Sequence, residues 1–155
     1  MRWAAVVLAL AGAVAASAVR AQPRHPVYLI YDGFIVNADG SRTLAFGYHN
    51  VNHVDVTAAG DDNAFLAGAA DRNQPTVFRP GRHRFACVMV VPDGSDDRLQ
   101  WRVRFAGHTS TTTPRMLDPL YALEEASARQ AVEGIDVEGA PPGTCLPRDA
   151  ASERR

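Results

Sequence analysis

Residues 27–50 read VYLIYDGFIVNADGSRTLAFGYHN, two runs of β-type residues separated by a polar turn. The run from Val27 to Val36 is rich in the β-branched and aromatic residues that favour strands. Asn37–Ser41 is dense in turn formers, and the glycine of its Asp-Gly pair takes a positive φ without steric penalty. From Arg42 to Tyr48 large apolar residues alternate with smaller ones, which is typical of a strand with one buried face. We therefore predict a β-hairpin that serves as scaffold rather than as a site.

A second pair of predicted strands lies at His83–Val91 and Leu99–Phe105, with Pro92–Asp97 as the turn between them. Apolar residues occupy alternate positions in both, and in the second strand they alternate with Gln and Arg. This pattern indicates half-buried antiparallel strands. We expect the two to be adjacent, with Trp101 at the centre of the core.

Three further segments complete the predicted β-structure. Val51–Val56 reads as a short strand, Gln74–Gly81 as an edge strand held between prolines, and Ala106–Thr113 as one more strand. No helical segment separates the strands, which disfavours parallel pairing. Close spacing and Gly, Pro and Asp turns favour an all-β, antiparallel immunoglobulin-like β-sandwich.

The chain divides into four predicted parts. Asp118 is a good N-cap for a helix rich in Leu, Ala and Glu, and a Pro-rich, charged segment follows that helix. The parts are a signal peptide over residues 1–21, the β-sandwich over 22–118, the short helix over 119–134 and a flexible tail over 135–155.

The N-terminus has the pattern of a secretory signal peptide. A short basic start precedes an uninterrupted apolar stretch over residues 4–16, and small residues then allow cleavage after Ala18 or Ala21. The apolar stretch is short for a membrane span, so we expect no stable membrane anchor after cleavage. The sequence therefore predicts a secreted or periplasmic protein.

Charge and composition narrow the function classes. The formal net charge is −1, and removing Arg2 and Arg20 with the signal peptide takes away two positive charges, leaving −3. This acidic balance disfavours nucleic acid as a partner. All 16 basic residues are Arg, so mechanisms that need a lysine amine are excluded. We expect no cofactor.

The two cysteines suggest a disulfide. Cys87 and Cys145 lie 58 positions apart in a chain with an export signal, where oxidising conditions favour pairing. On the chain-entropy model an unstrained bridge of this length contributes about 4 kcal/mol. The alternative is a small core residue at Cys87 and a free thiol at Cys145.

A group of uncharacterised secreted bacterial proteins resembles this chain in five short blocks. The blocks of that group are Y-x-G, N-x-D-G-S, F-G-Y-x-N, Q-P-T-x-F and L-D-P, found here at Tyr31–Phe34, Asn37–Ser41, Phe46–Asn50, Gln74–Pro80 and Leu117–Tyr121. The resemblance spans most of residues 28–122 and implies a secreted β-sandwich. It carries no assigned activity and transfers no site residues. Chains of that group tend to end soon after L-D-P, so the resemblance implies that the helix and the Cys145 tail are an extension here.

His49 and His53 are weak candidates for metal ligands. Their spacing suits a zinc pair on a helix, whereas on a continuous strand residues four apart are separated by about 13 Å. A bend at residues 50–52 would bring the two histidines close enough to share a metal, with Asp55 or His25 as a further ligand. A hydrolase with a sequence-scattered site near His49, His53 and Asp55 is a corresponding alternative function. Solvent-facing histidines at a strand end are the simpler interpretation, so we predict no metal.

Arginine clustering is the main candidate binding feature. Arg84, Arg102 and Arg104 fall on the two strands predicted to be adjacent, and Arg suits recognition of carboxylate or phosphate. Two interpretations stay open: the acidic segment from Asp118 to Glu138 covers this face, or the face binds an envelope protein or an anionic glycan.

The expected function is a non-catalytic binding or accessory module. No nucleophile elbow or paired Cys and His signature is found in the sequence. A carbohydrate-binding module is the first alternative, and it requires at least two coplanar exposed aromatics. The candidate aromatics are Tyr28, Tyr31, Phe34 and Tyr48.

Overall fold

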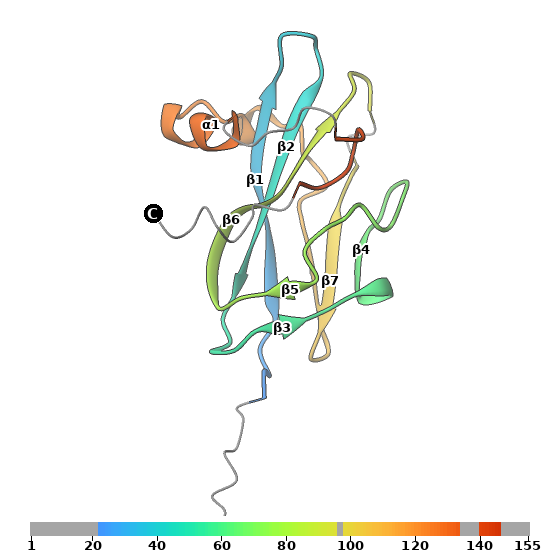
Figure 1. Ribbon diagram of the computed structural model, residues 1–155, viewed down its shortest axis with the longest axis vertical. Helices are drawn as coiled ribbons and strands as arrows, with labels where there is room; N and C mark the ends of the chain where they lie inside the picture. Colours follow the sequence, from blue (N-terminus) through green and yellow to red (C-terminus); the bar gives the residue numbers. More distant parts are fainter. Residues whose placement is uncertain (1–21, 96–97, 134–139, 147–155) are drawn as a thin grey trace, which may run out of the picture.

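The computed structural model describes residues 22–95, 98–133 and 140–146 (Figure 1). The chain is mostly antiparallel β-sheet with one short α-helix. The strands are β1 Val27–Val36, β2 Arg42–Asn50, β3 Val56–Thr57, β4 Asn63–Phe65, β5 Val77–Phe78, β6 Gly81–Val91, β7 Trp101–Phe105 and β8 His108–Thr111. The predicted signal peptide and residues 134–139 and 147–155 of the predicted helix and tail lie outside the described residues.

The predicted hairpin is confirmed. β1 and β2 pair antiparallel, and β2 also pairs with β6, so that β2 is the central strand of a sheet β1-β2-β6. The connecting turn is closed by the Gly40 N–H, which donates to the Asn37 carbonyl at 3.0 Å. Gly40 has a φ of 85°, the left-handed value that the Asp-Gly pair predicts.

The predicted adjacency of the second strand pair is wrong. β6 lies in the first sheet, whereas β7 is the central strand of a second sheet, β4-β7-β8. Met89 of β6 and Trp101 of β7 belong to the same apolar core, so the two strands face each other across that core. Alternation shows that a strand has a buried face, but it does not specify the pairing partner. The connection over residues 92–100 is also longer than a tight hairpin turn.

A small two-stranded pair closes one end of the molecule. β3 and β5 pair antiparallel through only two residues each, Val56 with Phe78 and Thr57 with Val77. The predicted strands at Val51–Val56 and Gln74–Gly81 are therefore mostly loop. Prolines at positions 75 and 80 flank β5 and have no N–H for ladder bonds, which accounts for its shortness.

The core between the two larger sheets is built around Trp101. Its side chain is fully buried, and its ring lies 6.0 Å from the Phe65 ring in a stacked arrangement and 6.4 Å from the Phe46 ring edge-on. The indole N–H donates to the Asn63 side-chain oxygen at 2.7 Å, so its polar atom is satisfied. Trp101 is thus the central core residue that the alternation predicts.

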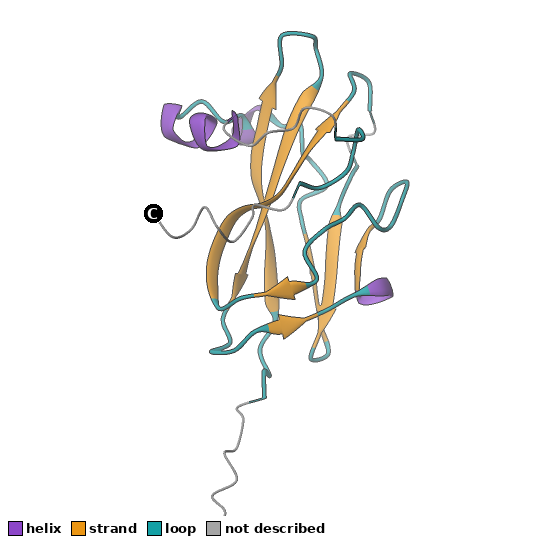
Figure 2. Cartoon of the chain, in the orientation of Figure 1, coloured by secondary structure: helices purple, strands orange, loops and turns teal. Residues whose placement is uncertain are grey.

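The C-terminal helix begins later than predicted. α1 spans Ala126–Glu133, and the preceding turn Pro119–Tyr121 is a separate 3₁₀ helix capped by the Asp118 carboxylate, which accepts the Leu120 N–H at 3.0 Å. α1 buries Ala128 and Val132 in an apolar cluster with residues of all three strands of the first sheet. It therefore covers the outer face of that sheet near the β1–β2 turn (Figure 2). None of the helices within the described residues is long and apolar enough to cross a bilayer.

Residues 140–146, which the sequence assigns to the tail, lie against β6. The Gly143 N–H donates to the Val90 carbonyl at 2.7 Å, and the Leu146 N–H donates to the Val88 carbonyl at 2.8 Å. Cys145 and Cys87 form a disulfide with a sulfur–sulfur distance of 1.93 Å. This bridge attaches the C-terminal segment to the centre of β6.

We expect Trp101→Ala to lower the free energy of unfolding by about 3–5 kcal/mol, the usual effect of removing a buried aromatic. Trp101→Phe retains apolar volume but leaves the Asn63 oxygen without its donor, so a loss of about 1–3 kcal/mol is expected. Denaturant unfolding of the oxidised protein measures both. Leu120→Ala is the control, since Leu120 is 89% exposed. A free energy of unfolding for Trp101→Ala close to that of the Leu120→Ala control would contradict this account of the core.

Candidate functional site

The outer face of the first sheet has a half that α1 does not cover. The register places Tyr28, His49 and Arg82 directly opposite one another on β1, β2 and β6. Tyr28 is 50% exposed, and His49 and Arg82 are also solvent-exposed. We call this surface the open half, and it consists of Tyr28, Asp32, Gly47, His49, Arg82 and Arg84.

Asp32 is the buried centre of the open half. Its side chain is only 3% exposed, and it forms an ion pair with Arg82 and lies 3.8 Å from the guanidinium of Arg84. The backbone N–H of Phe85 donates to its second carboxylate oxygen at 2.9 Å. Phe85 has a φ of 57°, and the pairing of β6 with β2 shifts register nearby. A backbone irregularity in β6 thus accompanies the contact with this carboxylate.

Gly47 makes room for this ion pair. A Cβ atom at this position would overlap the Asp32 carboxylate, the Arg82 guanidinium and the His83 carbonyl. Asp32 comes from β1 and Arg82 from β6, so their side chains meet over the central strand. A glycine in a strand interior marks such a close approach.

Burial dominates the electrostatics of Asp32. Desolvation raises the pKa of this carboxyl above its ordinary value, and the Phe85 N–H and the Arg82 and Arg84 guanidiniums offset only part of the effect. Arg84 is 49% exposed and Arg82 32% exposed. Two guanidiniums facing solvent thus share one buried carboxylate, which leaves the described part of the open half with net positive charge.

The structure separates Arg84 from the other two candidate arginines. Arg102 and Arg104 lie on β7, where they stand opposite Thr111 and Thr109 of β8 on the outer face of the second sheet. The two sheets share the core between them, so these arginines and Arg84 point to opposite sides of the molecule. The single arginine face expected from the sequence does not form, because it depended on β6 and β7 being neighbours.

The β7 arginines also have acidic surroundings. Arg102 donates to the Asp61 backbone carbonyl at 3.1 Å, and Arg104 lines a hollow of about 310 Å³ together with Asp62. Asp61 and Asp62 thus lie beside these two arginines. Of the two arginine surfaces, the open half is the more strongly positive.

The acidic C-terminal segment does not satisfy these arginines within the described residues. α1 contacts the sheet through apolar side chains, and its Glu133 pairs with Arg129 of the same helix at 2.7 Å. The only described ion-pair partner of Arg84 is Asp32. Asp136 and Glu138, which belong to the same segment, lie outside the described residues.

Asparagines rather than histidines organise the loop after β2. The buried Asn50 side chain donates to the Val54 and Phe78 carbonyls at 3.0 and 2.8 Å, and Asn52 accepts two backbone N–H groups from residues 24 and 25. His49, His53 and Asp55 are exposed, and no cluster of three or more His, Cys, Asp or Glu residues suited to a metal occurs among the described residues. The Asn-Val-Asn pattern could have signalled this loop, because Asn side chains replace backbone partners in turns.

The four candidate aromatics do not form one platform. Tyr31, Phe34 and Tyr48 are buried in the core, and only Tyr28 of the four is exposed. Tyr31, Phe34 and Tyr48 therefore serve the core, and Tyr28 alone offers a ring to a ligand.

The pKa of Asp32 yields a prediction for stability. The folded state holds the proton of the Asp32 carboxyl group more tightly than the unfolded chain does, because the pKa of Asp32 is raised on folding. The free energy of unfolding therefore falls as the pH rises from the ordinary pKa range of Asp through the raised pKa of Asp32. Asp32→Asn keeps an acceptor for the Phe85 N–H but does not titrate. We expect the wild-type Tm minus the variant Tm to decrease from about pH 3 to about pH 7. An increase over this range would mean that the two arginines outweigh burial.

Comparisons of this chain with models of protein families, with curated proteins and with solved structures each find no match. Function must therefore be inferred from the contacts of the chain itself. The open half of the first sheet is the surface with the clearest chemical character.

Proposed function

We propose that the protein is an exported, non-catalytic module that binds an anionic glycan through the open half. The observation that carries this proposal is the excess of exposed guanidinium over carboxylate around Asp32. A planar guanidinium matches the two oxygens of a uronic acid carboxylate. Arg84 is the residue best placed for this role, since Arg82 already forms hydrogen bonds with the Tyr48 and His83 carbonyls at 3.2 and 2.5 Å.

The composition of the open half favours a sugar over a protein partner. Protein interfaces usually centre on a cluster of several large anchors, mostly Trp, Tyr and Arg, that pack into desolvated pockets. The open half offers one exposed ring, Tyr28, beside cationic and polar side chains. A single ring next to guanidiniums suits the face of a sugar with a carboxylate at its edge. An acidic envelope protein is the competing partner.

Export and an immunoglobulin-like sandwich belong to the same proposal. The charged start, apolar stretch and small residues of positions 1–21 support export, as does the Cys87–Cys145 disulfide. Two antiparallel sheets around a buried Trp support the sandwich. We also propose kinship with the secreted bacterial proteins that the five sequence blocks resemble.

The test is binding to polygalacturonate, measured by affinity electrophoresis, with neutral dextran as the uncharged comparison. We expect retardation by the acidic polymer, little by dextran, and weaker binding at high salt. Arg84→Gln is expected to weaken binding about tenfold or more, the effect of losing one charge-assisted contact of about 1.5–3 kcal/mol. Tyr28→Ala is expected to weaken it to a smaller extent.

Arg104→Gln is the matched control, because it removes the same charge from the outer face of the other sheet. Equal losses of affinity for polygalacturonate in Arg84→Gln and Arg104→Gln would mean that binding depends on net charge alone, which would contradict the proposed site. If the polymer does not bind but an acidic envelope protein does, with dependence on Arg84, the open half is a protein-docking surface instead.

A further inference from the structure

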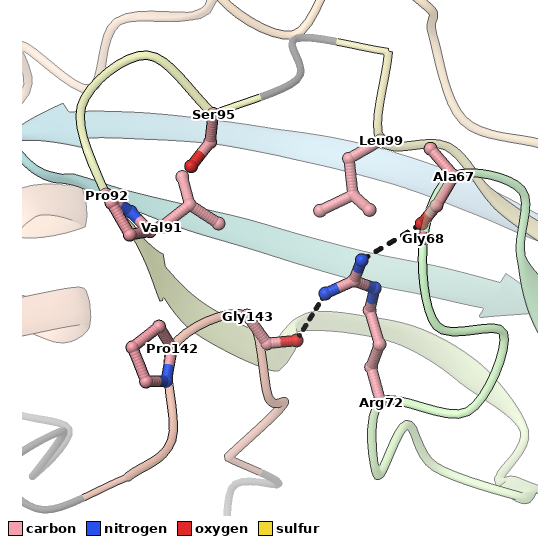
Figure 3. Close-up of a pocket in the computed structure, with 9 residues that line it drawn as sticks. All are labelled: Ala67, Gly68, Arg72, Val91, Pro92, Ser95, Leu99, Pro142 and Gly143. Carbon is pink, nitrogen blue, oxygen red and sulfur yellow. Dashed lines mark hydrogen bonds between the residues drawn. The ribbon is translucent and has the colours of Figure 1, made fainter.

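A cavity of about 330 Å³ lies beside the end of β6 at Val91, and no residue of the open half lines it (Figure 3). Parts of three segments distant in the sequence line this half-open cavity: the loop between β4 and β5, the described residues of the connection between β6 and β7, and the C-terminal segment. Its walls are mainly apolar and include Val91, Pro92, Leu99 and Pro142. A volume of this size admits a small organic molecule.

Arg72 is the one charged residue lining the described part of this cavity. Its guanidinium donates to the Gly143 carbonyl at 2.9 Å and to the Ala67 carbonyl at 2.9 Å. Its Nε is buried and has no hydrogen-bond partner, and no carboxylate of the described residues pairs with it. Burial lowers the pKa of Arg72, because it disfavours the charged form.

This arrangement leaves a positive charge without a counter-charge among the described residues. Neutral carbonyls satisfy hydrogen bonds of a guanidinium but do not neutralise its charge. The Phe65 ring, whose centroid lies 5.7 Å from the guanidinium carbon, adds a cation–π contact but no negative charge. Each terminal nitrogen of Arg72 carries a second hydrogen beyond the one used by its carbonyl partner. The Ser95 hydroxyl also points toward the cavity and offers a further donor (Figure 3).

The few donors and the apolar walls of the cavity favour one kind of anion. A phosphate needs many donors, whereas this cavity offers one guanidinium and one hydroxyl between apolar walls. A carboxylate needs fewer donors and carries only one charge. The apolar walls favour a ligand whose carboxylate is attached to a short apolar group.

We propose that this cavity is a binding site for a small carboxylate with a short apolar group, held by Arg72 and Ser95. Such a ligand is either a free aliphatic acid or the C-terminal residue of a peptide. The site is independent of the glycan proposed for the open half and uses none of its residues.

The disulfide holds one wall of this site in place. The Cys145 N–H donates to the Arg72 carbonyl at 2.6 Å, and the Asn73 side chain donates to the Cys145 carbonyl at 3.1 Å. Cys145 is bridged to Cys87, so Gly143 and Pro142 are positioned through that bond. We expect reduction of the disulfide to weaken ligand binding.

Calorimetric titration of the oxidised protein with four probes tests the proposal. The probes are N-acetyl-leucine, its carboxamide, N-acetylglycine and 4-methylpentanoate. N-acetyl-leucine is expected to bind about tenfold or more tightly than its carboxamide, which lacks the charge, and than N-acetylglycine, which lacks the apolar group. Equal binding of 4-methylpentanoate assigns the site to free acids, and weaker binding assigns it to peptide C-termini. Equal affinity for the acid and the carboxamide would overturn the proposal.

Variants separate the site from the fold. Arg72→Gln is expected to abolish binding, and Ser95→Trp is expected to block the cavity while leaving the Arg72 hydrogen bonds and the Tm unchanged. Arg84→Gln, on the open half, is the matched charge control and is expected to bind normally. Unchanged binding of N-acetyl-leucine by the Ser95→Trp variant would overturn the proposal. Asp96 and Asp97 follow Ser95 but lie outside the described residues; binding that appears only in a D96N/D97N variant would mean that the chain's own carboxylates neutralise Arg72, and would also overturn it.

Discussion

The contact of Asp32 with Arg82 over Gly47 organises the sheet on which the proposed function rests. It joins the two outer strands of β1-β2-β6 above the central one, and it can form only because residue 47 has no side chain. On one side of this contact the outer face is apolar and is covered by α1. On the other side it is polar, positive and exposed. The ion pair therefore marks the boundary between a face used for packing and a face available for binding.

The second organising element is the attachment of the C-terminal segment to β6. The Cys87–Cys145 disulfide and the backbone hydrogen bonds at Gly143 and Leu146 bring this segment beside the loop that carries Arg72. A half-buried guanidinium then meets two carbonyls and an apolar cavity. Each contact satisfies a hydrogen bond, but none of them among the described residues supplies a negative charge. The chemistry of the cavity follows from that imbalance.

Local features were predictable and pairings were not. The β1–β2 hairpin and the central position of Trp101 follow from alternation and turn chemistry, and both are present. The placement of β6 beside β7 failed, since alternation only reports that one face of a strand is buried. The start of the helix predicted over 119–134 is wrong, because Asp118 caps a short 3₁₀ turn and α1 begins later, at Ala126. The arginine face failed for the same reason as the strand pairing on which it depended.

The sequence by itself determined the strand segments that became β1, β2, β6, β7 and β8, where the tight turn lies and which two cysteines are available to pair, but not β4 or the short extents of β3 and β5. These properties depend on residues close together along the chain and on residue type. Only the tertiary structure decided that Asp32 meets Phe85, 53 positions away, and that Arg72 meets Gly143, 71 positions away. Contacts at such separations arise from the packing of whole elements against a shared core. No local pattern of hydrophobicity or charge encodes them, so both proposed binding surfaces emerged only with the fold.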